Sequence, residues 1–255
     1  MLDLDADVLR DFHREVITWA GSLTAARPLI VDVGAGTGTG SLALARHLPD
    51  AAVTAVDVDP AMLDHVRDRA AALGLADRIR TVEADLDRPW PDLGAADLVW
   101  AAASMHHMAD PAHALAQALA ALRPGGVMVI TELESFPRFL PDGPGADLEA
   151  RCHAETGRIR VEAGMHMDED WAKRLAEAGF EGVAERRFDI ALTGPLPPAA
   201  GRYAEVSLQR MRHGLADRLS EDDLAALAAL ADSVRDRDDL IVRTVRTVWA
   251  ARRPA

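Results

Sequence analysis

Short apolar runs alternate with segments of helical periodicity along the first half of the chain. Apolar runs bounded by turn residues are typical of buried strands, and a 3.6-residue apolar period is typical of helices. The predicted strands are 29–33, 53–58, 79–83, 97–101 and 127–131. The predicted helices are 8–20, 42–47, 61–73 and 111–122, with Gly74 and the Pro-Gly-Gly at 124–126 as stop signals. This alternation predicts a parallel sheet with helices on both faces.

The second half of the chain has a less regular pattern. It predicts helices at 168–178, 203–214 and 221–234, and strands at 183–190 and 240–248. Asp168 is the expected N-cap of the first of these helices. The alternation of apolar and polar residues in 240–248 indicates an edge strand, and no regular element is predicted within 134–167.

Composition limits the classes of protein to which the chain can belong. It has 255 residues, 28 Lys plus Arg and 41 Asp plus Glu, so its formal net charge is −13. Such a charge opposes binding to nucleic acid and to anionic membranes, and no dense basic run offsets it. No apolar stretch is long enough to span a membrane. The acidic start of the chain lacks a signal-peptide pattern, so the cytoplasm is the expected compartment.

Cysteine and metal-ligand patterns are equally restrictive. Cys152 is the only cysteine, which excludes an intrachain disulfide and a multi-cysteine metal site. The segment after the fourth strand contains two histidines but no carboxylate pair before Asp110. We therefore expect no metal site.

A glycine-rich loop, VDVGAGTG at 31–38, follows the first predicted strand. Ligands of doubly wound sheets bind at this position. The dinucleotide pattern G-x-G-x-x-G/A fails in both registers, because Thr39 and Ser41 occupy the third glycine position. Asp32 would also repel a pyrophosphate, whereas it suits a ligand with an ammonium group. S-adenosylmethionine carries an ammonium, a carboxylate and a sulfonium.

The loop and four later segments resemble the class I S-adenosylmethionine-dependent methyltransferases, and most closely the small-molecule subgroup of the ubiquinone-biosynthesis type. The later segments are AVDVDPAML, EADLDRPWP, ADLVWAAASMHHMADP and LRPGGVMVITE, in the family's order. The resemblance implies a doubly wound, Rossmann-like, seven-stranded and mostly parallel sheet with an antiparallel final strand. It also implies helical lid insertions and a single methyltransferase domain over 1–255, with an N-terminal helical segment (1–27), a cofactor-binding core (28–133) and lid segments on the acceptor side (134–167 and 191–238).

The same resemblance assigns the cofactor contacts. Asp57, about 20 residues after the glycines, is expected to bind the ribose hydroxyls, and Asp85 the adenine amine. The full expected set is Asp32, Gly34, Ala35, Gly36, Gly38, Asp57, Val58, Met62, Asp85, Leu86 and Ala101.

Methyl transfer is an in-line displacement, so the protein mainly aligns the acceptor and excludes water. A general base would help a hydroxyl or amine acceptor, and histidine is the natural candidate. The ranked candidates are His106 and His166, with His107 and His153 as alternatives; Glu132 and Glu134 also lie near the end of the fifth strand. The remaining alternative is that no base is used. Tyr203 and Met211 either pack in the core or line an acceptor pocket.

The predicted function is methyl transfer from S-adenosylmethionine to O, N or C of a small molecule, with S-adenosylhomocysteine as product. One alternative is a protein of the same fold that binds the cofactor but catalyses a non-methylating reaction or has lost transfer. A nicotinamide-dependent oxidoreductase is opposed by Asp32 and by the missing third glycine.

Overall fold

The computed structural model describes residues 1–255, which form two compact units. The sheet unit comprises Asp11–Glu132, Asp168–Arg187 and Thr247–Ala255, and the helical unit comprises Met1–Arg10, Leu133–Met167 and Phe188–Arg246. Both segments expected to form a lid, 134–167 and 191–238, fall in the helical unit. Their role as a lid and the single-domain organisation stay predictions.

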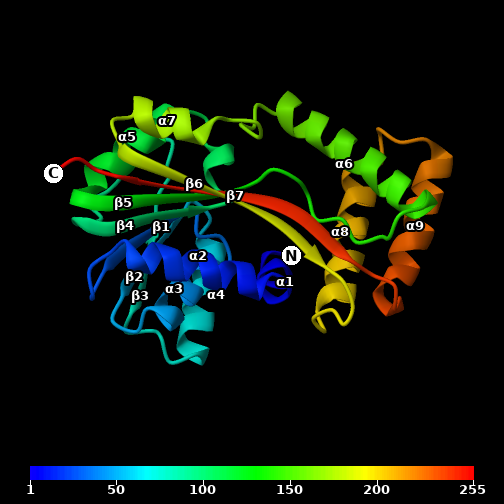
Figure 1. Ribbon diagram of the computed structural model, residues 1–255, viewed down its shortest axis with the longest axis horizontal. Coiled ribbons are helices and arrows are strands. Elements are labelled where there is room, and N and C mark those ends of the chain that lie inside the picture. The colour runs from blue at the N-terminus through cyan, green and yellow to red at the C-terminus, as the bar shows by residue number, and fades with distance from the viewer. The chain divides into compact units, whose positions relative to one another are not determined.

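Seven strands form one sheet in the order β3-β2-β1-β4-β5-β7-β6 (Figure 1). Their bounds are β1 Leu29–Val33, β2 Ala52–Asp57, β3 Ile79–Glu83, β4 Ala96–Ala102, β5 Leu122–Leu133, β6 Glu181–Leu192 and β7 Val242–Arg252. The first five strands are parallel, and β7 is antiparallel to both of its neighbours. The predicted doubly wound, seven-stranded and mostly parallel sheet is confirmed.

The prediction that the last strand lies at an edge is wrong. β7 lies between β5 and β6, and most of its residues are buried, whereas β6 is the exposed edge strand. The alternation in 240–248 therefore reflects two differently packed faces and not an unpaired edge. β5 also begins earlier than expected, since the Pro-Gly-Gly at 124–126 lies within the strand, where Gly125 N–H donates to the Arg253 carbonyl at 3.0 Å.

Helices cover both faces of the sheet in the sheet unit. Figure 1 shows α5 and α7 on one face and α2, α3 and α4 on the other. Their bounds are α2 Arg10–Ser22, α3 Thr39–His47, α4 Pro60–Ala72, α5 Pro111–Ala121 and α7 Trp171–Glu177. A continuous core under α5 and α7 includes the buried Leu115, Trp171 and Ile130. Burial of such side chains contributes about 1.5–3 kcal/mol each.

The starts of α2 and α7 differ from the predictions for identifiable reasons. The expected helix 8–20 is divided at Leu9 into α1 (Leu2–Val8) and α2, because Leu9 has a non-helical ψ of 29°. Asp170, and not Asp168, caps α7: its carboxylate accepts the N–H of Lys173 at 2.9 Å. Both residues are aspartates, and only the path of the chain decides which of them reaches the first turn.

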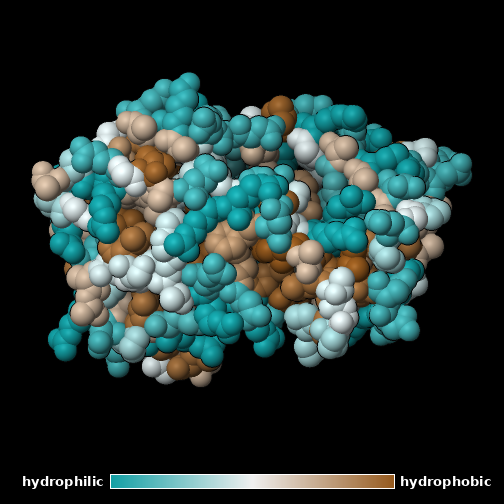
Figure 2. Space-filling view, in the orientation of Figure 1, coloured by the Kyte–Doolittle hydropathy of each residue, from teal (hydrophilic) through white to brown (hydrophobic).

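The helical unit contains α1, α6 Pro144–Glu162, α8 Ala200–Gly214 and α9 Glu221–Ser233. The expectation that 134–167 lacks a regular element is wrong, because α6 is 19 residues long. The surface drawn over α6 is mostly hydrophilic (Figure 2), which explains the weak apolar period in the sequence. The helix packs against α8 and α9, and Arg151 pairs with Asp223 of α9 at 2.6 Å. Tertiary contacts thus stabilise a helix that its own pattern does not indicate.

Two short 3₁₀ turns complete the fold, η1 (Met105–His107) and η2 (Val234–Asp236). None of the helices combines the length and the apolar character that crossing a bilayer requires.

Candidate functional site

The loop between β1 and α3 is sharply bent and lies against β2. Three of its residues have left-handed φ angles: 70° at Gly34, 52° at Gly36 and 76° at Gly38. The N–H groups of Gly34 and Ala35 both donate to the Val56 carbonyl at 2.9 Å. A Cβ at Gly34 would lie 2.5 Å from the Ser104 Cβ. Glycine is therefore required there both by the backbone conformation and by the contact with Ser104.

Asp57, the last residue of β2, supports this loop. Its Oδ2 accepts the N–H of Gly36 at 2.8 Å, and its Oδ1 accepts the N–H of Asp59 at 3.0 Å. Each carboxylate oxygen has two lone-pair sites, so each retains capacity for one more donor. Asp57 therefore connects the first two strand ends and remains able to accept hydroxyl groups from a ligand.

Asp32, on β1 beside the loop, is a buried carboxylate. It is 2% exposed, and its Oδ2 accepts the Ser41 hydroxyl of α3 at 2.6 Å. Loss of hydration on burial raises the pKa of Asp32 to about 6, against the opposing effect of the Ser41 hydrogen bonds; the charge of Asp57 raises it further. A positive group of a ligand near this loop would favour the ionised form.

Residues after β2 and β3 flank the loop. Val58 is 62% exposed although it is apolar, and it follows Asp57 directly. Asp85 accepts the N–H of Asp87 at 3.1 Å and the Nε of Arg88 at 3.0 Å. The other expected contacts are the half-buried Met62 of α4 and the buried Leu86 and Ala101. Contacts of these residues with a nucleoside stay predictions.

The segment after β4 is strained and anchored. Ala103 has a φ of 53°, which is rare for a residue with a side chain and is common at functional sites. The hydroxyl of the next residue, Ser104, donates to the Val33 carbonyl at 2.7 Å. The first strand end and the fourth strand end are thus joined directly beneath the glycine loop.

His106 and Glu132 form a buried pair at the ends of β4 and β5. His106 is 3% exposed and Glu132 is 6% exposed. The His106 Nδ1 and the Glu132 Oε2 are 2.5 Å apart, and Glu132 Oε1 accepts the His106 backbone N–H at 3.3 Å. The sequence indicated both residues separately, but not that they form a pair. Their proximity follows from strand order, because β4 and β5 are parallel neighbours whose carboxyl ends meet at one edge.

Comparison with known proteins places this arrangement in a family. The family model described as "Methyltransferase domain" matches residues 30–126. A trans-aconitate 2-methyltransferase of Methylobacterium radiotolerans is 31% identical over 242 residues, which cover 92% of this chain and 79% of that protein. The chain belongs to the class I S-adenosylmethionine-dependent methyltransferases.

Other known proteins are similar to this methyltransferase over a smaller part of their own length. The 27-O-demethylrifamycin SV methyltransferase of Amycolatopsis mediterranei is 30% identical over 185 residues, 72% of this chain and 65% of that protein. The chain spans about half or less of several other curated relatives. The solved structure of a Haemonchus contortus phosphoethanolamine N-methyltransferase 2 with S-adenosylhomocysteine has the same fold, with a TM-score of 0.59 and 16% identity over 96% of this chain and 53% of that one.

S-adenosylmethionine is the cofactor of this family, and the residues present fit it. The three glycines of the loop expose backbone that carries no side chain, as close approach of an amino-acid group requires. Asp32 supplies a negative charge for an ammonium group, and Asp57 retains acceptor capacity for two hydroxyls. When bound, the cofactor supplies an electrophilic methyl group on a sulfonium.

The affinity of the methyltransferase for S-adenosylhomocysteine is expected to fall as the pH decreases through about 6, the pKa of Asp32. The ligand carries an ammonium group, so protonation of Asp32 removes the favourable charge. Below that pH the dissociation constant should rise by up to about tenfold per pH unit. Calorimetric titration from pH 5 to 8 measures the effect, with Asp32→Asn as the control for other groups that titrate.

The raised pKa of Asp32 also affects the free energy of unfolding, which should decrease as the pH rises, whereas the ligand affinity should increase. Because the native state binds a proton at Asp32 more readily than the unfolded state, this residue's contribution to stability is full below its unfolded pKa and is lost as the pH rises through about 6. Asp32→Asn should remove this contribution. Urea unfolding measures the free energy of unfolding of the wild type and of Asp32→Asn between pH 4 and 7. The same pH dependence in the two proteins would contradict a raised pKa at Asp32.

Asp57→Ala is expected to weaken S-adenosylhomocysteine binding by about 1.5–3 kcal/mol, the scale of hydrogen bonds to a charged group. The variant loses acceptors both for the ligand and for the Gly36 N–H. Asp59→Ala is the matched control, since Asp59 caps α4 through the Ala61 N–H and makes no such contact with the loop. Calorimetry that showed equal affinity for the two variants would exclude Asp57 from the site.

The four candidate histidines occupy different places. His106 and His107 lie in η1, with ring centroids 4.2 Å apart; His106 is buried and His107 is exposed. His153 lies on α6 of the helical unit, and His166 lies in the turn after α6. His106 has a buried carboxylate within hydrogen-bond distance, whereas the Nε2 of His153 lies 3.9 Å from a Glu149 oxygen. No group of three metal-ligating side chains is found.

Proposed function

We propose that this methyltransferase transfers the methyl group of S-adenosylmethionine to a hydroxyl oxygen of a small molecule, with His106 as general base. The observation that carries the proposal is the buried 2.5 Å contact between His106 Nδ1 and Glu132 Oε2. A carboxylate is already an anion at neutral pH and needs no such pair, whereas a hydroxyl must lose its proton.

Glu132 orients the imidazole. An ionised carboxylate only accepts hydrogen bonds, so the proton of neutral His106 resides on Nδ1 and the lone pair on Nε2. The second Glu132 oxygen accepts the His106 backbone N–H and fixes the carboxylate. Low exposure of both side chains strengthens the interaction relative to water.

The roles of the residues follow from this geometry. His106 Nε2 accepts the hydroxyl proton as the new oxygen–carbon bond forms and the sulfur–carbon bond breaks. Glu132 stabilises the resulting imidazolium. The loop at 34–38, with Asp57, holds the cofactor in the orientation required for in-line displacement.

An assay with a labelled methyl group tests the proposal against the alternatives. The wild-type protein is incubated with S-adenosylmethionine carrying a labelled methyl and a panel of small phenols, alcohols, amines and carboxylic acids. We expect label in base-stable ethers, with one S-adenosylhomocysteine per methyl transferred. Label confined to amines, carbon or base-labile esters would contradict hydroxyl methylation. Cofactor binding without transfer across the panel would support the non-methylating alternative.

A further inference from the structure

The helical unit contains a cavity of about 240 Å³ that is built from its own residues. Its walls come from α6, α8, the segment after β5 and Met1. Apolar side chains such as Ile159, Met211 and Leu215 line much of it. A volume of this order suits part or all of a small organic molecule.

The charged groups of this cavity are all basic. Arg160, Arg210 and His153 line it, and no aspartate or glutamate does. The whole chain has a net charge of −13, so the positive charge of the cavity lining is opposite in sign to the net charge of the protein. No hydrogen bond or ion pair is found for the Arg210 guanidinium. Arg210 is exposed, and its guanidinium at the wall of a partly apolar cavity can pair with an anionic ligand.

His153 adds a second polar group. Its Nε2 is buried and has no hydrogen-bond partner, and it lies 3.9 Å from Glu149 Oε1, beyond hydrogen-bond distance. Both Glu149 oxygens accept backbone N–H groups, from Phe139 at 2.9 Å and Leu140 at 3.3 Å. A buried nitrogen without a partner is costly in the absence of a ligand.

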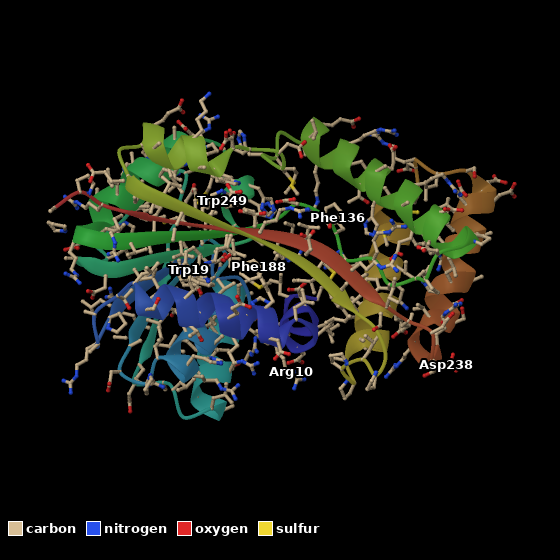
Figure 3. The ribbon with its side chains drawn as sticks, in the orientation of Figure 1. Arg10, Trp19, Phe136, Phe188, Asp238 and Trp249 are labelled. Carbon is tan, nitrogen blue, oxygen red and sulfur yellow. The ribbon has the colours of Figure 1, made fainter.

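Phe136, labelled in Figure 3, provides a flat wall. Its ring is stacked with the His153 imidazole at 5.5 Å and 10°, and the Arg160 guanidinium lies 4.3 Å from its centroid. These interactions hold the three side chains in defined orientations. The cavity therefore combines planar and aliphatic walls with positive charge.

We propose that this cavity binds a small organic acid, a carboxylate on a planar or aliphatic apolar body. Arg210 pairs with the carboxylate, and the walls formed by Phe136 and Met211 contact the body.

Calorimetric binding of 2-naphthoate and of its neutral analogue 2-naphthamide tests the site without turnover. We expect wild-type protein to bind the carboxylate about tenfold or more tightly than the amide, the scale of one hydrogen bond to a charged group. Arg210→Gln should reduce carboxylate affinity to that of the amide. Arg212→Gln is the matched control, because Arg212, like Arg210, is exposed on α8 but does not line the cavity.

The outcomes separate this proposal from the proposed function. Equal binding of the two ligands, no binding of either, or equal losses in the Arg210 and Arg212 variants would overturn the carboxylate site. A carboxylate preference that depends on Arg210 supports it, even if the labelled-methyl assay detects no hydroxyl methylation.

Discussion

His106→Gln is expected to lower kcat by about 10²–10⁴-fold while S-adenosylhomocysteine affinity stays within about twofold of wild type. Glutamine retains a polar side chain near Glu132 but cannot take up a proton at neutral pH. The expected cofactor contacts include the glycine loop and Asp57, and His106 is not among them. Single-turnover transfer of labelled methyl, with calorimetry in parallel, separates the chemical step from binding.

Two variants serve as controls for this prediction. His107→Gln changes the adjacent, exposed histidine and should retain nearly full activity. Glu132→Ala should lower kcat in the same direction as His106→Gln, and Glu132→Gln should recover part of the loss, because an amide oxygen can still accept from Nδ1. A loss of less than about tenfold in His106→Gln would exclude a base role. If His106→Gln and Glu132→Ala each lowered both the affinity for S-adenosylhomocysteine and the melting temperature, the pair would have a structural role.

Gly34→Ala is expected to weaken S-adenosylhomocysteine binding by about 30-fold or more. A left-handed φ costs a residue with a side chain about 1–2 kcal/mol, and overpacking costs about 1–3 kcal/mol. Both apply here, because φ is 70° and the new Cβ would lie 2.5 Å from the Ser104 Cβ. The loop must shift to relieve the contact, and its backbone then no longer matches the ligand.

Gly74→Ala isolates the backbone cost in this experiment. Gly74 has a φ of 67°, and a Cβ at this residue would have no atom within 4 Å, so only strain should appear, as lower stability with unchanged affinity. The double variant Gly34→Ala with Ser104→Gly removes the clashing carbon and should recover part of the affinity, although the hydroxyl bond to the Val33 carbonyl is lost. Circular dichroism confirms that each variant is folded. Wild-type affinity in Gly34→Ala would remove the loop from the site.

The sequence alone determined the elements whose stability comes from local pattern. β1 and β3 begin and end where the sequence predicts, because residues that favour extended structure form each of these short runs. The predicted helix 61–73 corresponds to α4, which begins at Pro60, because proline suits the first turn of a helix. The glycine loop and Asp32 were predicted for the same reason, since backbone conformation and charge sign are properties of a few adjacent residues, whereas Asp57 was assigned from the family resemblance.

Only the tertiary structure decided the features that depend on distant contacts. α6 is stabilised by packing on α8 and α9, which its polar sequence does not reveal. The position of β7 inside the sheet depends on β6 pairing beyond it. The His106–Glu132 pair joins residues 26 positions apart, and the basic cavity collects Phe136, Arg160 and Arg210 from three separate segments. Sequence patterns encode neighbours along the chain, whereas these contacts arise from the order in which strands and helices pack.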